Sequence, residues 1–225
     1  MLTARKPSPL MALLDQILPP RCIATGEIVD AQGMISPAFW SELAFIEAPL
    51  CHTCGIPFSF PTHEGTVCAA CIDYPPEFDQ ARSAVVYNDA SRQLVLDFKY
   101  GDRLNAVHTF APWLLRSGKD LIAKTDFILP VPLHRQKLWQ RRFNQSALIA
   151  QEIGKRAEKK WLADALLRLR ATVPQKGLSR KERNDNVKNA FGINTRYLQE
   201  IKDKNVLLID DVFTSGATLN ECARA

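Results

Sequence analysis

The sequence predicts an α/β fold, with a mainly parallel sheet from about residue 77 and a small cysteine-rich module before it. Two observations support this prediction. Strand patterns alternate with helical ones in the second part of the chain, and four of the six cysteines form two Cys-x2-Cys pairs ahead of Pro75-Pro76. Because paired prolines are typical of a turn or linker, we expect two units, residues 1–75 and 77–225, in a chain of 225 residues and 25.3 kDa.

The expected elements follow the hydrophobic pattern along the chain. Residues 10–18 are typical of an amphipathic helix that Pro19-Pro20 ends, and no internal repeat is visible by eye. After the linker we expect a strand over 81–87 and a helix over 91–98 capped by Ser91. The remaining expected elements are a helix over 104–115 despite Pro112, buried strands over 127–133 and 206–209, a helix over 144–157, a long loop over 170–183 that merges into a helix, and a helix from Thr218 to the end.

The composition excludes several classes of protein. Apolar residues make up 46% of the chain and charged residues 24%, with 10 Gly and 14 Pro, which is typical of a globular domain and excludes a collagen-like chain. No apolar run approaches the roughly 18 residues of a membrane span, and residues 10–18 are interrupted by Asp15. We therefore expect no membrane span, no secretory signal and a cytoplasmic protein.

The two cysteine pairs predict a structural zinc site. Cys51 and Cys54 form one pair, Cys68 and Cys71 the other, and Gly55 follows the first pair where a knuckle favours a residue free to take positive φ. Four thiolates complete a tetrahedral zinc site and leave no open position for catalysis. Two disulfides are the alternative, although a reducing compartment disfavours them. Of the other two cysteines, Cys22 stands alone, and Cys222 is expected to be a small core residue.

A phosphate-binding loop is predicted where the last strand meets the last helix. Asp210 and Asp211 end the strand over 206–209, and small or hydroxylated residues come next. A helix N-terminus offers unpaired N–H groups and the positive end of its dipole to an anion, whereas the two carboxylates suit the hydroxyls of an attached sugar. Together they describe a site for ribose 5-phosphate. The residues expected to hold the phosphate are Thr214, Ser215, Gly216, Ala217 and Thr218.

Charge is distributed unevenly along the chain. Residues 1–130 carry 10 Lys/Arg and 14 Asp/Glu, residues 131–204 carry 18 and 7, and residues 205–225 carry 1 and 3. The basic block suits a polyanion, either phosphates or single-stranded nucleic acid, since Trp139 and Phe143 could stack on bases beside cations. A solvated helical face, with Trp139 and Phe143 in the core, is the alternative. The basic turn with Arg141 and Arg142, before a helix at a strand's carboxyl end, suits pyrophosphate.

Several motifs in order resemble the competence protein F family. Residues 206–218 resemble the phosphoribosyl-pyrophosphate (PRPP) motif of type I phosphoribosyltransferases, with Ser215-Gly216 where Thr-Gly is frequent. The other matching segments are the four-cysteine knuckles, residues 96–101 (Leu-Asp-Phe-Lys-Tyr-Gly), 131–133 with 142–145 (Arg-Phe-Asn-Gln), and 175–186. The resemblance implies a type I phosphoribosyltransferase-like domain behind a zinc ribbon, PRPP bound with Mg²⁺, and a role in the uptake of transforming DNA.

The same resemblance implies roles for a second set of residues. The segment from Thr172 to Arg183 resembles the flexible loop that closes over the substrate, so Lys176, Arg180 and Arg183 are implied to act in catalysis. Arg141 and Arg142 are implied to neutralise the pyrophosphate. The implied partners are PRPP, single-stranded DNA, and a DNA-uptake helicase or other competence proteins.

Two departures from the family pattern are visible. Relatives carry further cysteine pairs near the N-terminus, whereas here Cys22 is followed by Ile-Ala-Thr25 and residues 36–39 read Ser-Pro-Ala-Phe, so we expect one zinc instead of two. The family also continues into a last strand beyond the position of Ala225, so we expect either a truncated chain or a sheet one strand short with an exposed edge.

Three functions remain open from the sequence. The first is an enzyme that transfers phosphoribose to an acceptor the sequence does not identify. The second is a PRPP-sensing, single-stranded DNA-binding protein without turnover, because fold alone does not settle activity. The third is a zinc adaptor, which leaves the phosphate loop unexplained.

Overall fold

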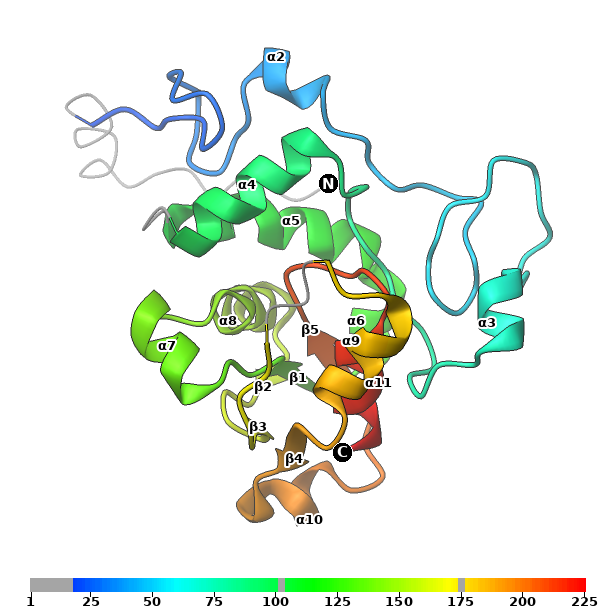
Figure 1. Cartoon of the computed structure of the whole chain (residues 1–225). Helices are drawn as coiled ribbons and strands as arrows, with labels where there is room; N and C mark the ends of the chain where they lie inside the picture. The colour runs from blue at the N-terminus through cyan, green and yellow to red at the C-terminus, as the bar shows by residue number, and fades with distance from the viewer. Residues whose placement is uncertain (1–17, 101–103, 174–176) are drawn as a thin grey trace.

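The computed structural model describes residues 18–100, 104–173 and 177–225. Its centre is a parallel three-stranded sheet in the order β2-β1-β5, formed by Lys160–Trp161, Phe127–Pro130 and Val206–Ile209 (Figure 1). Phe127 pairs with Lys160 on one side, and Phe127 to Pro130 pair with Val206 to Ile209 on the other. β1 is the central strand, and its residues 128–130 are buried. The expected strand over 127–133 is confirmed as far as Pro130, and the expected strand over 206–209 is confirmed in its bounds. In the described part of the chain β5 is at an edge of the sheet, so of its residues only Ile209 is buried.

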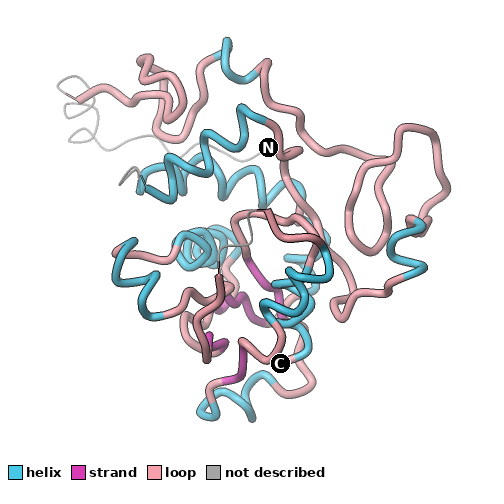
Figure 2. The backbone as a smooth tube through the Cα atoms, viewed as in Figure 1, coloured by secondary structure: helices cyan, strands magenta, loops and turns pink. Residues whose placement is uncertain are grey.

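Helices pack against this sheet and lie between its strands along the chain (Figures 1 and 2). α8 (Gln145–Ala157) packs against β1, and α5 (Val107–Ser117) packs against α8. A second, antiparallel pair of strands, β3 (Leu166–Arg168) and β4 (Phe191–Ile193), lies apart from the main sheet. The other helical segments are α2 (Pro37–Trp40), α3 (Ala69–Asp73), α4 (Asp89–Tyr100), η1 (Leu104–Ala106), α6 (Lys119–Lys124), α7 (Arg135–Arg141), α9 (Arg180–Val187), η2 (Thr195–Tyr197), α10 (Leu198–Ile201) and α11 (Ala217–Arg224).

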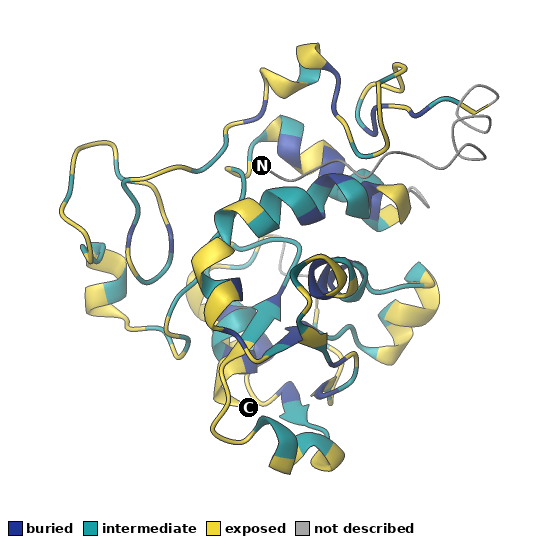
Figure 3. Ribbon diagram, turned by 180° about the vertical axis from the view of Figure 1, so that it is seen from behind, coloured by how far each residue is buried: buried dark blue, intermediate teal, exposed yellow. Residues whose placement is uncertain are grey.

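Two apolar clusters hold these layers together. The larger contains Leu94 and Phe98 of α4, Ile128 of β1 and Ile153 of α8, all almost fully buried. The smaller lies under β3, β4 and α11, where Cys222 is 4% exposed. Cys222 is therefore the small core residue that the sequence predicts. Figure 3 shows the buried residues inside the α/β part, while the loop that carries α3 is mostly exposed.

Several predicted elements are confirmed and others are wrong. The helices over 104–115, 144–157 and from Thr218 correspond to α5, α8 and α11. The expected strand over 81–87 is wrong. Residues 81–87 instead form one isolated β-bridge, between Val85 and Phe45, with one backbone hydrogen bond on each side of it. The expected helix over 10–18 lies almost wholly outside the described residues.

The start of α4 differs from the prediction in an instructive way. Ser91 is not the cap: the helix begins at Asp89, and Asn88 stands just before it. The Asn88 side chain accepts from the Ser91 backbone N–H, and the Ser91 hydroxyl accepts from the Asn88 N–H, both at 2.9 Å. This reciprocal pair satisfies two free N–H groups at the helix start.

The N-terminal module contacts the α/β part of the chain closely. The Ala81 N–H donates to Thr53 O at 2.7 Å, and Arg82 donates to His52 O at 3.0 Å. Glu77 pairs with Arg224 of α11 at 2.7 Å. The boundary between residues 75 and 77 stays a prediction, but residues on its two sides contact each other. Within the described ranges, no helix is both long and apolar enough to cross a bilayer.

Candidate functional site

Four cysteine thiols meet at one point of the N-terminal module. The Sγ atoms of Cys51, Cys54, Cys68 and Cys71 all lie within 4.8 Å of one another, and those of Cys54 and Cys68 are 3.7 Å apart. Thiolates bound to one zinc at about 2.3 Å would lie about 3.8 Å apart in a tetrahedron. The cluster therefore fits a structural zinc ion with four protein ligands, as the sequence predicts.

The four thiols of the cluster are not joined as disulfides, and their pKa values are shifted in different directions, since burial raises those of Cys54 and Cys71. All six cysteines are free thiols. Burial opposes ionisation of Cys51, but hydrogen bonds from the backbone N–H groups of Cys68, Cys54 and Thr53 lower its pKa to about 6. His52, a conceivable substitute ligand, faces Gln80 at 2.7 Å and is not among the clustered ligands.

The predicted phosphate loop lies between β5 and α11. Gly216 precedes the helix with a φ of 75°, a left-handed conformation that glycine adopts without strain. Among the described residues, the buried hydroxyl of Ser215 has no hydrogen-bond partner. A buried polar group without a partner costs free energy, and an anion bound at the first turn of α11 would satisfy it. The loop therefore fits a phosphate group.

The two carboxylates at the end of β5 have different partners. Asp210 accepts from the Ser146 hydroxyl at 3.4 Å and from the Asp211 N–H at 2.9 Å. Asp211 forms an ion pair with Lys99 at 2.8 Å, with both side chains less than one fifth exposed. Burial, and then the charge of Asp211, raise the pKa of Asp210 to about 7. These contacts hold the Asp210 and Asp211 carboxylates in place, and a ligand with hydroxyl groups can replace Ser146 or Lys99 as their partner.

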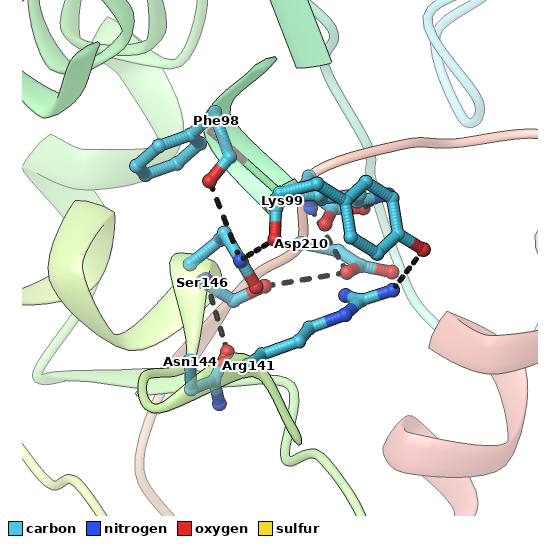
Figure 4. A network of polar contacts seen from close by, with 9 residues as sticks. Phe98, Lys99, Arg141, Asn144, Ser146 and Asp210 are labelled. Atoms are coloured by element: carbon cyan, nitrogen blue, oxygen red, sulfur yellow. Dashed lines mark hydrogen bonds and ion pairs between the residues drawn. The ribbon is translucent and has the colours of Figure 1, made fainter. Parts of the chain in front are cut away.

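Residues of the 142–145 segment hold α4 and α8 next to these carboxylates (Figure 4). Asn144 caps α8 by accepting from the Ser146 N–H at 3.0 Å, and its amide donates to Val131 O after β1 at 3.0 Å. The buried Gln145 amide donates to the Lys99 carbonyl at 3.3 Å. The segment therefore fixes the end of α4, from which Lys99 reaches Asp211.

Several cations gather near the same strand ends. Burial lowers the pKa of Lys137, and the charges of Arg168, Arg141 and Lys99 lower it further. Arg168 at the end of β3 stacks on the Phe191 ring at 5.1 Å, and its Nε is buried with no hydrogen-bond partner among the described residues. Arg141 stacks on the Tyr100 ring at 5.0 Å and donates to its hydroxyl at 3.0 Å. Clustered cations of this kind fit a polyanion.

A cavity of about 1490 Å³ lies along β5 and reaches the two carboxylates, but Lys99, Lys137, Arg141 and Arg168 are not among the residues that line it. Asp210, Asp211, Thr214, Ser215 and Gly216 line it, together with Arg180 and Arg183 of α9. Ligand pockets are usually about 300–1,000 Å³, so a ligand held by these residues would occupy only part of the space. The predicted acidic, hydroxyl and α9 residues are therefore brought to one cavity.

Known proteins can now be compared with this arrangement. Residues 13–72 match the model of the double zinc ribbon domain. DNA utilization protein YhgH of Escherichia coli strain K12 is 31% identical over 180 residues, which is 78% of this chain and 76% of that protein. The chain belongs to the family of YhgH and competence protein F. Competence protein F of Haemophilus influenzae is 29% identical over 181 residues, 78% of this chain and 77% of that protein.

Membership of the competence protein F family confirms the resemblance seen in the sequence. Competence protein ComFC of Bacillus subtilis is more distant, 26% identical over 191 residues, which is 82% of this chain and 74% of that protein. No solved structure matches the chain significantly. The architecture shown for this family member is therefore a mixed α/β fold with a parallel sheet and a zinc-ribbon-like cysteine cluster.

Other residues predicted for the site of this family member lie in different places. Arg141 and Arg142 stand at the end of a short helix, α7, where the sequence predicts a simple basic turn, and Arg142 has a φ of 64°. α7 was missed because its exposed sequence has no apolar stripe. Neither residue lines the cavity; nor do Ala217, buried at the start of α11, and Thr218. Lys176 lies outside the described residues.

The two predicted stacking rings have opposite environments. Trp139 on α7 is 90% exposed, which fits a surface that stacks bases. Phe143 is partly buried and contacts the Phe98 ring in the core, at 6.4 Å between centroids. For Phe143 the core alternative is therefore confirmed.

Sequence reasoning missed two cations of the site. Lys99 lies within the 96–101 motif, but the motif alone gives it no role, and no sequence pattern marks Arg168; Lys137 was expected only as one of the cations beside Trp139 for a nucleic-acid backbone. A signal for Lys99 was present in the sequence, since Asp97 and Lys99 are the two charged residues in the mostly apolar stretch 94–100. Arg168 ends a strand of three residues, too short for a periodicity signal.

Proposed function

We propose that this protein binds PRPP with Mg²⁺ at the carboxyl ends of β1 and β5 and transfers its phosphoribosyl group to an acceptor. The observation that carries the proposal is the buried hydroxyl of Ser215, which has no hydrogen-bond partner among the described residues. Ser215 lies in the loop just before α11, next to the two carboxylates. Phosphate would accept hydrogen bonds from this loop, and ribose hydroxyls would donate to Asp210 and Asp211. These residues together match both halves of ribose 5-phosphate.

The cations supply the second half of the argument. The positive charges of Arg168, Arg141 and Lys99 act on Lys137, and pyrophosphate with Mg²⁺ bound beside Lys137 would offset this repulsion. In the transfer, the bond from ribose C1 to the pyrophosphate oxygen breaks as the acceptor bonds to C1. Pyrophosphate leaves with the electron pair, and the acceptor's proton goes to solvent. Positioning and charge stabilisation would supply the catalysis, with Arg180 and Arg183 on the cavity wall and Lys176 on the preceding segment.

The cellular setting is inferred from the relatives. Proteins named for competence and DNA utilization share most of this chain's length, which supports a role in DNA uptake together with other competence proteins. A site of four thiolates that binds zinc is typical of a reducing compartment, and on this ground we propose a cytoplasmic location.

Calorimetry with Mg²⁺ and PRPP tests the binding site. Asp211→Ala and Ser215→Ala are expected to weaken binding, because a hydrogen bond to a charged group contributes about 1.5–3 kcal/mol, which is tens-fold in affinity. Ser41→Ala, whose hydroxyl bonds only its own helix end at Ala38 O, is the matched control. Unchanged affinity in both site variants would overturn the PRPP proposal. Pyrophosphate release across a panel of bases then separates turnover from sensing.

A second candidate function is supported by Trp139. We propose that α7 binds single-stranded DNA, because an indole that is 90% exposed stands on a helix with Arg135, Lys137 and Arg141. Stacking contributes about 1–3 kcal/mol per base with little sequence preference. This interpretation also fits a PRPP-sensing protein without turnover.

A labelled oligonucleotide titrated at several salt concentrations tests this surface. Binding is expected to weaken with salt at a log–log slope of about −0.7 per phosphate neutralised, and Trp139→Ala should reduce affinity about tenfold or more. Phe60→Ala, which removes another exposed ring, should not. A flat salt response, or equal binding by Trp139→Ala, would leave PRPP as the only anion for these cations.

A further inference from the structure

Two turns of the N-terminal module have the same backbone hydrogen bonds. Each begins at a cysteine and closes on a glycine with positive φ, 76° at Gly26 and 70° at Gly55. Three backbone hydrogen bonds, all between 2.8 and 3.0 Å, occur in both turns. In the first turn they run from Cys22 N to Glu27 O, from Gly26 N to Cys22 O and from Val29 N to Pro20 O. In the second turn they run from Cys51 N to Ile56 O, from Gly55 N to Cys51 O and from Phe58 N to Pro49 O. Isolated bridges, Arg21 to Ile28 and Leu50 to Pro57, stand at the same places.

The second part of each unit also matches. A short helix comes after an extended cap residue in both, α2 after Ser36 (φ −60°, ψ 145°) and α3 after Cys68 (φ −75°, ψ 155°). The expectation of no internal repeat is therefore wrong at the level of structure. The repeat aligns Cys22 with Cys51, Thr25 with Cys54, Ser36 with Cys68, and Phe39 with Cys71.

Only one of the four zinc ligands has a cysteine at the matching place in the first unit, namely Cys51, which is matched by Cys22. The Thr25 hydroxyl donates to the Ser36 hydroxyl at 3.3 Å, in the place where Cys54 and Cys68 approach to 3.7 Å. Phe39 packs against the apolar core instead of pointing a thiol at a metal. A phenyl ring and two neutral hydroxyls are not zinc ligands, so the first site of a double zinc ribbon does not fit these residues.

We infer that residues 20–43 are a zinc ribbon that folds without metal, held by packing on the α/β core. Cys22, Ile23, Ile35 and Leu43 are buried in the same cluster as Phe98. The Thr109 hydroxyl donates to Gly33 O at 2.9 Å, and a Cβ on Gly33 would lie 2.6 Å from His108 O. This close approach joins the first ribbon to α5.

The second ribbon also makes a close approach, since a Cβ on Gly55 would lie 2.5 Å from Ala81 O and the Ala81 N–H donates to Thr53 O at 2.7 Å, but it buries far fewer side chains than the first. Between residues 49 and 73 only Cys51 and Gly55 are buried, so metal binding there has to supply most of the folding free energy. One module therefore contains two copies of the same turn, one stabilised by tertiary packing and one by zinc.

Amide hydrogen exchange of the full chain with and without a strong chelator tests this inference. After chelation, the amides of Cys51, Gly55 and Phe58 are expected to lose protection at least tenfold, while those of Cys22, Gly26 and Val29 keep theirs. Loss of protection in both sets together would overturn the inference, and so would a second zinc in the purified wild-type protein.

A gain-of-site variant provides the complementary test. Thr25→Cys with Ser36→Cys and Phe39→Cys should raise the zinc content from one to two per chain, and Co²⁺ should give the spectrum of tetrahedral thiolate coordination. The matched control adds three thiols out of register at exposed positions, Glu27→Cys with Ala38→Cys and Trp40→Cys, and should stay at one zinc. A second zinc in the control and not in the in-register variant would contradict the repeat. If loss of Phe39 prevents folding, the Thr25→Cys, Ser36→Cys double variant still offers three thiols to Co²⁺.

Discussion

The cysteine cluster takes all its ligands from one short segment between Cys51 and Cys71, whereas the groups around Asp210 come from α4, α7, α8, β3 and β5. The cluster lies in a loop with little buried surface. The carboxylates lie at the strand ends of a packed sheet, where Ser146 and Lys99 hold them in place. One site depends on its metal for folding, and the other depends on the fold for its shape.

This difference decides what a single substitution should do in each region. Removal of one thiolate should unfold its surroundings, because apart from a few hydrogen bonds to residues 81 and 82 the segment has little buried surface to hold it. Removal of one charged group at the strand ends should leave the fold intact and act on ligand binding and on the electrostatic part of stability, since the apolar clusters of the sheet do not include it.

The largest effect is expected from Cys54→Ser. The zinc content should fall from one per chain to none, and residues 49–73 should lose amide protection, while α8 and the sheet keep theirs. Elemental analysis and hydrogen exchange of the same sample measure both. The variants His52→Ala and His63→Ala are the controls, since neither imidazole belongs to the cluster, and a loss of zinc in either would contradict the four-thiolate assignment.

A smaller effect is expected from Lys137→Gln, with opposite signs for stability and for binding. Burial and neighbouring cations already lower the pKa of Lys137, so removal of its charge should raise the melting temperature slightly. Affinity for Mg²⁺-pyrophosphate should fall about tenfold or more, since a charged hydrogen bond contributes about 1.5–3 kcal/mol.

Lys155→Gln on the exposed side of α8 controls for the loss of a positive charge. It should change neither quantity. Unchanged pyrophosphate affinity in Lys137→Gln, or a lower melting temperature without ligand, would remove Lys137 from the anion site.

Sequence reasoning succeeded where the signal was local. The spacing of Cys51, Cys54, Cys68 and Cys71 predicts the metal cluster, because all four ligands and their turns lie in one segment. The run from β5 through Asp210 to α11 was equally local, so its strand, loop and helix were predicted almost to the residue.

The parts that were missed depend on contacts between distant segments. Arg168 reaches the site from a three-residue strand, and the Lys99 to Asp211 pair joins residues that only the sheet brings together. The family resemblance marked residues 22–25 and 36–39 as the place of the further cysteine pairs, but no repeat was visible in the sequence itself because the two copies share little beyond the knuckle cysteine and its glycine. Their equivalence is in backbone hydrogen bonds, which the sequence does not display.

The last prediction is a pH dependence set by Asp210. Burial, and then the charge of Asp211, raise its pKa to about 7 from a usual value near 4. The folded state therefore binds more protons than the unfolded state between these two values, and stability falls as pH rises from about 4 to 7 and then levels off. Asp210→Asn removes this titration, so its melting temperature should exceed that of the wild type by a margin that grows over that pH range. The limiting slope is about 1.4 kcal/mol per pH unit.

Melting curves at intervals between about pH 4.5 and about pH 8.5, a range that spans the titration, measure the margin between Asp210→Asn and wild type. Asp185→Asn, an exposed carboxylate on α9, should show no such growth. A margin that is constant with pH would mean that Asp210 is ionised throughout, and the carboxylate pair would then resemble the cysteine cluster in needing a cation to hold it. A growing margin would confirm that the fold itself holds this acid in its uncharged form until a ligand arrives.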